Sequence, residues 1–163
     1  MTSASLTRPS PPQHWRHRGH GTAPVGCRGI HVSGFTACLA HLSEADRTAY
    51  LAALPPGADV DHRGTPFTPE LLSRLLDALT ADPTTGTPHL GDARFEQATF
   101  SGDARFHRAS FSGEARFEVA TFAGVARFGE ATSSSTAQFG TATFIRDADF
   151  GGAAFEAAPG STR

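Results

Sequence analysis

The chain of 163 residues contains no lysine, so all 14 of its strongly basic side chains are arginines. This absence excludes the lysine of a P-loop, the lysine of a Schiff base and the active-site lysine of a protein kinase. The motifs GxSxG, HExxH and GxGxxG are also absent from the sequence. We therefore expect a protein that is not an enzyme.

Long apolar runs are missing at the start of the chain. Residues 1–24 are rich in Pro, Ser and His, and they match neither a signal peptide nor a membrane anchor. Their low hydrophobicity predicts a disordered tail, and residues 158–163 are expected to form a second one. We expect a cytoplasmic protein with no membrane partner.

Leucine is absent after Leu90, whereas eleven of the 13 phenylalanines lie beyond that residue. The change occurs at the Pro-, Thr- and Gly-rich stretch 82–91, which has the composition of a linker. The sequence thus predicts a small helical region over 25–81, a linker over 82–91 and a differently built region over 92–157.

A repeat of Ala followed two residues later by Phe fills the second region. Successive Phe residues are alternately five and six positions apart, which gives a double repeat of 11 residues, and only at Ser133 is an expected Phe missing. Such a short period indicates a stacked solenoid. The predicted core phenylalanines are Phe95, Phe100, Phe106, Phe111, Phe117, Phe122, Phe128, Phe139, Phe144, Phe150 and Phe155.

The spacing of Ala and Phe selects strand over helix. Residues two apart lie on the same face of a strand, so one face is Ala and Phe while the other is polar. A step of five residues turns about 500° around a helix and would scatter the Phe side chains over its whole surface. Very short strands that turn after each unit predict a parallel β-helix, with Phe rings stacked between coils.

The pattern Ala, variable, Phe, variable, variable resembles the pentapeptide-repeat family in its Phe-centred branch. That resemblance implies a right-handed quadrilateral β-helix, and twelve units at four per coil give about three coils. The segment 26–42 also resembles those that precede such repeats in actinobacteria, and the lack of lysine with abundant Ala, Arg and Gly fits a high-GC bacterial origin.

Two helices are expected before the repeats, and they supply a candidate cap. Ser43 is placed to cap a helix from Glu44 to about Ala53, and Thr68 with Pro69 begins one that reaches about Thr80. The second helix carries a leucine stripe suited to covering the open end of a β-helix, with 60–67 as an irregular first rung. No comparable cap follows Phe155, and the family resemblance implies an end-to-end homodimer through the C-terminal coil.

The two cysteines, Cys27 and Cys38, lie among several histidines. Cys38 and His41 form a Cys-x-x-His pair, and His20 would complete four ligands with Cys27, with His17 as the alternate. Thiolate sulfur and imidazole nitrogen are donors that zinc prefers, so the pattern predicts a possible structural zinc site. Reduced buried thiols are the slightly preferred interpretation, and a disulfide is the weakest in a cytosolic chain.

Arginines recur every eleven residues on the predicted outer surface, at Arg94, Arg105, Arg116 and Arg127. Such a ladder suits phosphate, but carboxylates stand two residues away in several repeats. Mutual neutralisation is the preferred interpretation, and nucleic-acid binding is not expected.

Some members of the pentapeptide-repeat family resemble a DNA duplex in shape and charge and bind type II topoisomerases. Residues 91–158 hold nine carboxylates and six arginines, which leaves a net charge of only −3. We therefore predict a non-enzymatic interaction scaffold with an unidentified protein partner. A DNA mimic that protects or inhibits gyrase is the alternative.

Overall fold

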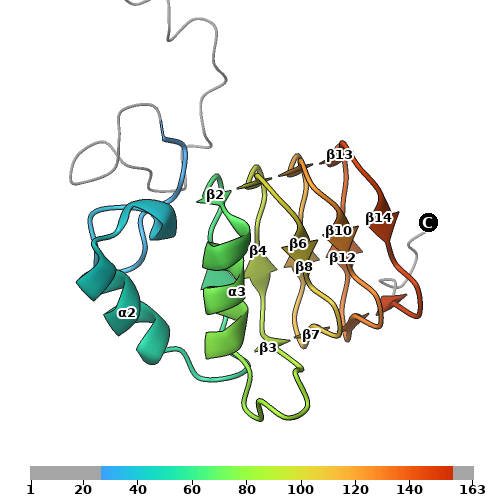
Figure 1. The fold of residues 1–163 in the computed structure, drawn as a ribbon, viewed down its shortest axis with the longest axis horizontal. Coiled ribbons are helices and arrows are strands. Elements are labelled where there is room, and N and C mark those ends of the chain that lie inside the picture. Colours follow the sequence, from blue (N-terminus) through green and yellow to red (C-terminus); the bar gives the residue numbers. More distant parts are fainter. Residues whose placement is uncertain (1–26, 156–163) are drawn as a thin grey trace, which may run out of the picture.

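The computed structural model describes residues 27–155, and within them a four-sided parallel β-helix begins after the helix Glu44–Ala52 and contains the helix Pro69–Ala78 in its first coil (Figure 1). Its sides are the sheets β1-β4-β8-β12, β2-β5-β9-β13, β6-β10-β14 and β3-β7-β11-β15. This confirms the predicted fold class. The strands are β1 (Val60–Asp61), β2 (Pro66–Phe67), β3 (His89–Leu90), β4 (Ala93–Arg94), β5 (Thr99–Phe100), β6 (Ala104–Arg105), β7 (Ser110–Phe111), β8 (Ala115–Arg116), β9 (Thr121–Phe122), β10 (Ala126–Arg127), β11 (Thr132–Ser133), β12 (Ala137–Gln138), β13 (Thr143–Phe144), β14 (Ala148–Asp149) and β15 (Ala154–Phe155).

Phenylalanine rings stack between coils because equivalent residues stand 22 positions apart. The rings of Phe100 and Phe122 have centroids 4.7 Å apart and planes 3° apart, and those of Phe106 and Phe128 are 5.0 Å and 3° apart. The alanines two residues earlier are fully buried through Ala131. In the last coil Phe139, Phe144 and Phe155 are only partly buried.

The steps of five and six residues correspond to two kinds of corner. In the five-residue steps the second residue after Phe has a positive φ, between 53° and 64°, at Gln97, Arg108, Val119, Glu130 and Thr141. In the six-residue steps the extra residue projects at the corner. There Oδ1 of Asp92 accepts a hydrogen bond from the amide of Glu114 at 2.9 Å, and Asp103 accepts one from Val125 at 3.0 Å.

An irregular first coil precedes the three regular ones. Val60 pairs with Ala93 and Phe67 pairs with Phe100, so the predicted first rung over 60–67 is confirmed. This register puts His62 in the place of Phe95 and Thr65 in the place of Ala98. The β-helix consequently begins before residue 92, and β3 lies inside the segment 82–91 that was expected to be a linker.

Helix α3 (Pro69–Ala78) lies between β2 and β3 in the chain and occupies the side of the first coil that has no strand, next to β6. Thr68 Oγ1 accepts a hydrogen bond from the amide of Leu71 at 3.1 Å, which caps the helix as expected. Its leucines are buried in the cluster that continues into the phenylalanine column, so the described residues form one core rather than two.

Helix α2 (Glu44–Ala52) lies outside the β-helix, beyond α3 (Figure 1). Ser43 Oγ accepts a hydrogen bond from the amide of Asp46 at 3.1 Å, so the second predicted cap is also confirmed. A 3-10 helix, η1 (Leu39–His41), precedes α2. No helix among residues 27–155 is long and apolar enough to cross a membrane.

Ser133 points into the core, in the column between Phe111 and Phe155, and is 4% exposed. Its hydroxyl donates to the carbonyl of Ser135 at 2.8 Å and accepts from the amide of the same residue at 3.3 Å. The missing phenylalanine is therefore replaced by a polar group that is satisfied within its own turn.

Candidate metal centre

Cys27, Cys38 and His41 converge at the N-terminal edge of the described structure. The two Sγ atoms are 3.6 Å apart, and Sγ of Cys38 is 3.3 Å from Nδ1 of His41. All three ligand atoms lie within 4.8 Å of one another, so this group could hold a metal ion. His17 and His20, the remaining predicted ligands, lie outside the described residues.

Backbone amides point at both sulfur atoms. The amide of Gly29 donates to Sγ of Cys27 at 3.3 Å, and the amides of Ala40 and His41 donate to Sγ of Cys38. In each case one donor lies two residues after the cysteine. Hydrogen bonds of this kind stabilise thiolates and orient sulfur ligands around a metal.

Gly29 is required for the close approach of the two cysteines. A Cβ atom at this position would lie 2.5 Å from Cβ of Cys38 and 2.8 Å from its Sγ, distances that side chains do not tolerate. Glycine therefore allows Cys38 to pack directly against the backbone that follows Cys27.

The pKa values of the two thiols are shifted in opposite directions. A hydrogen bond from Cys38 is the main cause that lowers the pKa of Cys27 to about 5, and the amide of Gly29 and the nearby His41 add to it against the effect of burial. The same hydrogen bond, together with burial, raises the pKa of Cys38. The contact thus favours the thiolate form at Cys27 and the protonated form at Cys38.

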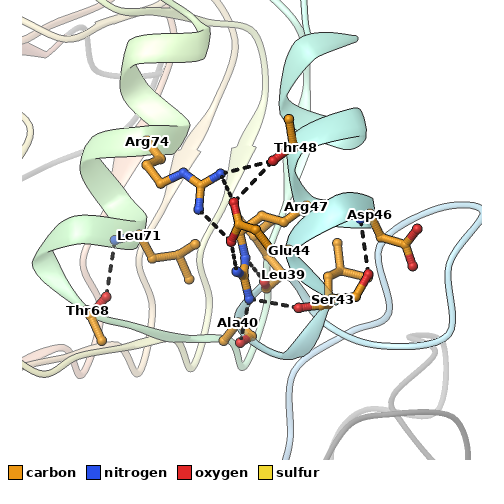
Figure 2. A network of polar contacts seen from close by, with 11 residues as sticks. Leu39, Ala40, Ser43, Glu44, Asp46, Arg47, Thr48, Thr68, Leu71 and Arg74 are labelled. Atoms are coloured by element: carbon orange, nitrogen blue, oxygen red, sulfur yellow. Dashed lines mark hydrogen bonds and ion pairs between the residues drawn. The ribbon is translucent and has the colours of Figure 1, made fainter.

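Arg47 fixes the 3-10 helix η1, which has Cys38 as its N-cap and ends at His41 (Figure 2). Its guanidinium donates to the carbonyls of Leu39 and Ala40 at 3.1 Å each and to that of Leu42 at 2.9 Å. These carbonyls have no helical partner at the end of so short an element. This role could not be predicted from the sequence, because the spacing of Arg47 does not indicate which carbonyls it contacts.

Glu44 connects the same region to α3. It forms ion pairs with Arg47 at 2.9 Å and with Arg74 at 2.8 Å (Figure 2). The hydrogen bond from Arg74 is the main cause that lowers the pKa of Glu44 to about 2. The two helices are therefore joined by charge as well as by the leucine core.

The segment that carries Cys27 lies against the first two coils. The amide of Ile30 donates to the carbonyl of Arg63 at 2.9 Å, and the guanidinium of Arg28 donates to the side-chain oxygen of Gln97. Between this segment and the first two coils is a pocket of about 350 Å³, lined by Cys27, Arg28, His41, Gly64, Pro66, Gln97 and Thr99. Two of the three candidate ligands thus face a space large enough for another side chain.

His62 is a buried polar residue that the sequence analysis missed. It is 1% exposed, and its Nε2 lies 3.1 Å from the hydroxyl of Tyr50 on α2. Burial lowers the pKa of His62 to about 4. The spacing of Val60, His62, Thr65 and Phe67 repeats the Ala and Phe spacing of later coils. This spacing could have indicated that the side chain of His62 points into the core.

Two of the four arginines of the ladder are paired with carboxylates. Arg116 hydrogen-bonds Glu114, and Arg127 is 4.0 Å from Asp103. Arg108, which is outside the ladder, contacts Glu130 at 3.0 Å. The outer surface of the β-helix is therefore balanced in charge at these positions, as the sequence analysis expected.

Comparison with protein-family models, curated proteins and solved structures found no match. Function is therefore inferred from the fold and from the groups that the fold brings together or leaves exposed.

Proposed function

We propose that this protein is a non-enzymatic interaction scaffold of the pentapeptide-repeat type, and that the open end of its β-helix binds a second copy of the chain. The observation that supports this proposal is the state of the last coil. Phe150 is 37% exposed, whereas the equivalent Phe128 and Phe106 are fully buried. An apolar end of this kind is stabilised by a further layer.

The backbone hydrogen bonds run in opposite directions on neighbouring sides of the β-helix. The amide of Ala115 donates forward to Thr136 in the next coil at 2.9 Å, whereas the amide of Thr143 donates back to Ala120 at 2.8 Å. At the last coil, the sides of β12 and β14 therefore present N–H groups. The sides of β13 and β15 present C=O groups, and within residues 27–155 neither set has a partner.

This alternation is self-complementary. A two-fold axis across the end of the rod, running through opposite corners, exchanges each side with its neighbour. The N–H groups of Ala137 and Phe139 would then face a side that offers the carbonyls of Ala142 and Phe144 in the second copy. The facing strands would be antiparallel, and two-fold symmetry is the commonest arrangement of homodimers.

Sedimentation velocity of the wild type and two variants tests the proposal. Ala148 is exposed only because no coil follows it, so Ala148→Arg places a charge on the end face and should give a monomer. Val119→Arg is the matched control, because Val119 is 52% exposed one coil earlier and Arg108 already occupies the same kind of corner. A wild type that is monomeric at micromolar concentration, or a dimer that persists in Ala148→Arg, would overturn the proposal.

A DNA mimic would require a strongly acidic surface, and the ion-paired arginines argue against one. A supercoiling assay with gyrase separates the two functions. If the protein is a scaffold, we expect no change in supercoiling and no protection against a quinolone. Protection would instead make the DNA mimic the preferred function.

We also propose zinc as the ion held by Cys27, Cys38 and His41. Two sulfur donors and one imidazole nitrogen suit a borderline-soft ion and do not suit calcium or magnesium, which take oxygen ligands. Bound zinc would stabilise the deprotonated form of both thiols, and its role would be structural.

A further inference from the structure

We infer that Cys27 and Cys38 are an oxidation site for hydrogen peroxide, at which the two thiols close reversibly into a disulfide. Cys27 is the sulfur that the oxidant reaches, and Cys38 is the sulfur that completes the bond. The inference depends on neither the scaffold nor the zinc proposal, because it concerns the two free thiols of the chain itself. Disulfides of cytosolic proteins are usually of this transient, redox-sensing kind.

The sulfur atoms of Cys27 and Cys38 are already in contact. Their Sγ atoms are 3.6 Å apart, and a disulfide bond is about 2.0 Å long, so they need to approach by only about 1.6 Å. The amide of Gly29 donates to Sγ of Cys27 at 3.3 Å, which positions this sulfur. A Cβ atom at residue 29 would lie 2.5 Å from Cβ of Cys38, so the contact depends on glycine at this position.

The chain between the two cysteines is already reversed. The amide of Val32 donates to the carbonyl of Ala37 at 2.9 Å, and Gly34 lies between them with a φ of 87°. Residues 27–38 therefore form a loop whose two ends meet in the reduced protein. Because the ends are already together, closing the disulfide in the folded chain requires little further loss of conformational entropy.

The two sulfur atoms differ in their access to solvent. Cys27 is half-buried and lines the pocket of about 350 Å³, whereas Cys38 is fully buried. Oxidation of a cysteine requires that the oxidant reach the sulfur. A small oxidant therefore meets Cys27 first, and Cys38 is protected until Cys27 has reacted.

The reaction balances with hydrogen peroxide as the only co-reactant. The sulfur of Cys27 attacks one peroxide oxygen, the O–O bond breaks, and the products are a sulfenic acid on Cys27 and one water. The sulfur of Cys38 then displaces the hydroxyl group from the sulfur of Cys27, and this group leaves as a second water with the thiol proton of Cys38. Two thiols are thus oxidised while one peroxide is reduced, and a dithiol reductant reverses the bond by exchange.

Oxidation changes this region in two ways. The same sulfur atoms are the proposed zinc donors, so the oxidised chain keeps only His41 of the three candidate ligands. The disulfide also joins the start of η1 to the segment 27–32, which is hydrogen-bonded to the first coil through Ile30 and Arg63. We therefore expect this segment to open less often in the oxidised protein than in the reduced one.

Mass spectrometry of the untagged full chain, treated with hydrogen peroxide in the presence of a chelator, tests the pair. The wild type should lose two hydrogen atoms. Trypsin cuts after Arg28, so digestion should yield two peptides of one chain linked between Cys27 and Cys38. A wild type that keeps both thiols, or that forms disulfides only between chains, would overturn the inference.

Single cysteine variants test the order of the two steps. In Cys38→Ser, the sulfur of Cys27 should gain one oxygen atom and react with dimedone, which captures sulfenic acids. In Cys27→Ser, the buried Cys38 should remain a thiol under the same treatment. If Cys38 alone oxidises as fast as Cys27 alone, the assigned roles are wrong.

Competition with dimedone tests whether the folded arrangement is responsible. The yield of disulfide relative to the dimedone adduct should be at least about tenfold higher in the folded wild type than in denaturing urea. Gly29→Ala should lower this ratio, because its methyl group meets Cys38, while Gly140→Ala is the matched control with an ordinary contact of 3.7 Å. Equal ratios in folded and unfolded protein would contradict the inference.

Hydrogen exchange tests the effect on the segment. The amide of Val32 should exchange at least about tenfold more slowly in the oxidised protein, while those of Phe106 and Phe117 should not change. If the disulfide forms and the exchange of Val32 stays constant, the oxidation site stands and its effect on the segment is overturned.

Zinc content and native mass are separate readouts. Native mass spectrometry of reduced protein, purified without added zinc, should show one zinc per chain. A metal-free reduced chain would overturn the zinc proposal and leave the disulfide pair in place. The proposed dimer forms at the opposite end of the β-helix and should persist after oxidation, so failure of this inference is distinguishable from failure of the scaffold.

Discussion

The hydroxyl of Tyr50 lies 3.1 Å from Nε2 of His62, and the two rings meet edge to face with centroids 5.8 Å apart. His62 occupies the place in the first coil that Phe95 occupies in the second. The N-terminal region thus covers the phenylalanine column through a polar contact, in which α2 supplies the partner for a buried imidazole.

The buried imidazole makes stability depend on pH. His62 has a pKa of about 4 in the folded chain and 6.5 as its ordinary value, so between these pH values the unfolded chain binds the proton and the folded chain does not. Stability therefore falls as the pH drops from 6.5 to 4, by about 3 kcal/mol from this group. Asp61 partly offsets the effect of burial.

Denaturant unfolding of His62→Phe across this pH range checks the sign. The variant should lose much of the pH dependence that the wild type shows between pH 6.5 and 4. Chelator in every sample removes the contribution of metal release. Equal slopes for the two proteins would mean that His62 does not control the acid sensitivity.

Ser133→Phe should raise the melting temperature, because it completes the column between Phe111 and Phe155. Burial of a phenylalanine side chain contributes about 1.5 to 3 kcal/mol, and the backbone already points residue 133 inward. Ser134→Phe, at the neighbouring exposed position, is the control and should not stabilise. A lower melting temperature for Ser133→Phe would show that the column has closed around the serine.

Val119→Gly should stabilise the protein. Val119 has a φ of 61°, which is costly for a β-branched residue, and Gly64 occupies the same side in the first coil with a φ of 71°. Relief of this conformation should exceed the entropic cost of glycine and leave a gain of up to about 1 kcal/mol. Val125→Gly, where φ is not positive, should destabilise instead, and thermal unfolding of both variants decides the matter.

Arg47→Ala should lower both stability and zinc affinity. Its side chain is 16% exposed and donates to three carbonyls around η1, so the free energy of unfolding should fall by about 2 kcal/mol. Arg74→Ala is the matched control, since it removes an exposed ion pair to Glu44 and a long hydrogen bond to Thr48 and should have a smaller effect. Equal losses in urea unfolding would mean that Arg47 acts through charge alone.

The regular coils could be predicted from the sequence because the Ala and Phe spacing directly determines which side chains point inward. The starts of the two helices could be predicted because the hydroxyls of Ser43 and Thr68 accept hydrogen bonds from backbone amides within the first turn. The first coil could not be predicted in full, because His62 and Thr65 replace Phe and Ala there. The place of α3 on the side of this coil that has no strand is a tertiary feature that helix propensity does not determine. The pairing of the candidate ligands Cys38 and His41 was predictable from local spacing, whereas the role of Arg47 depends on tertiary contacts.

The proposed association of the end coil with a second copy of the chain is tested by the native mass of the untagged protein, compared with that of Ala148→Arg. We expect a dimer for the wild type and a monomer for the variant. A monomeric wild type, with its end coil intact, would contradict it.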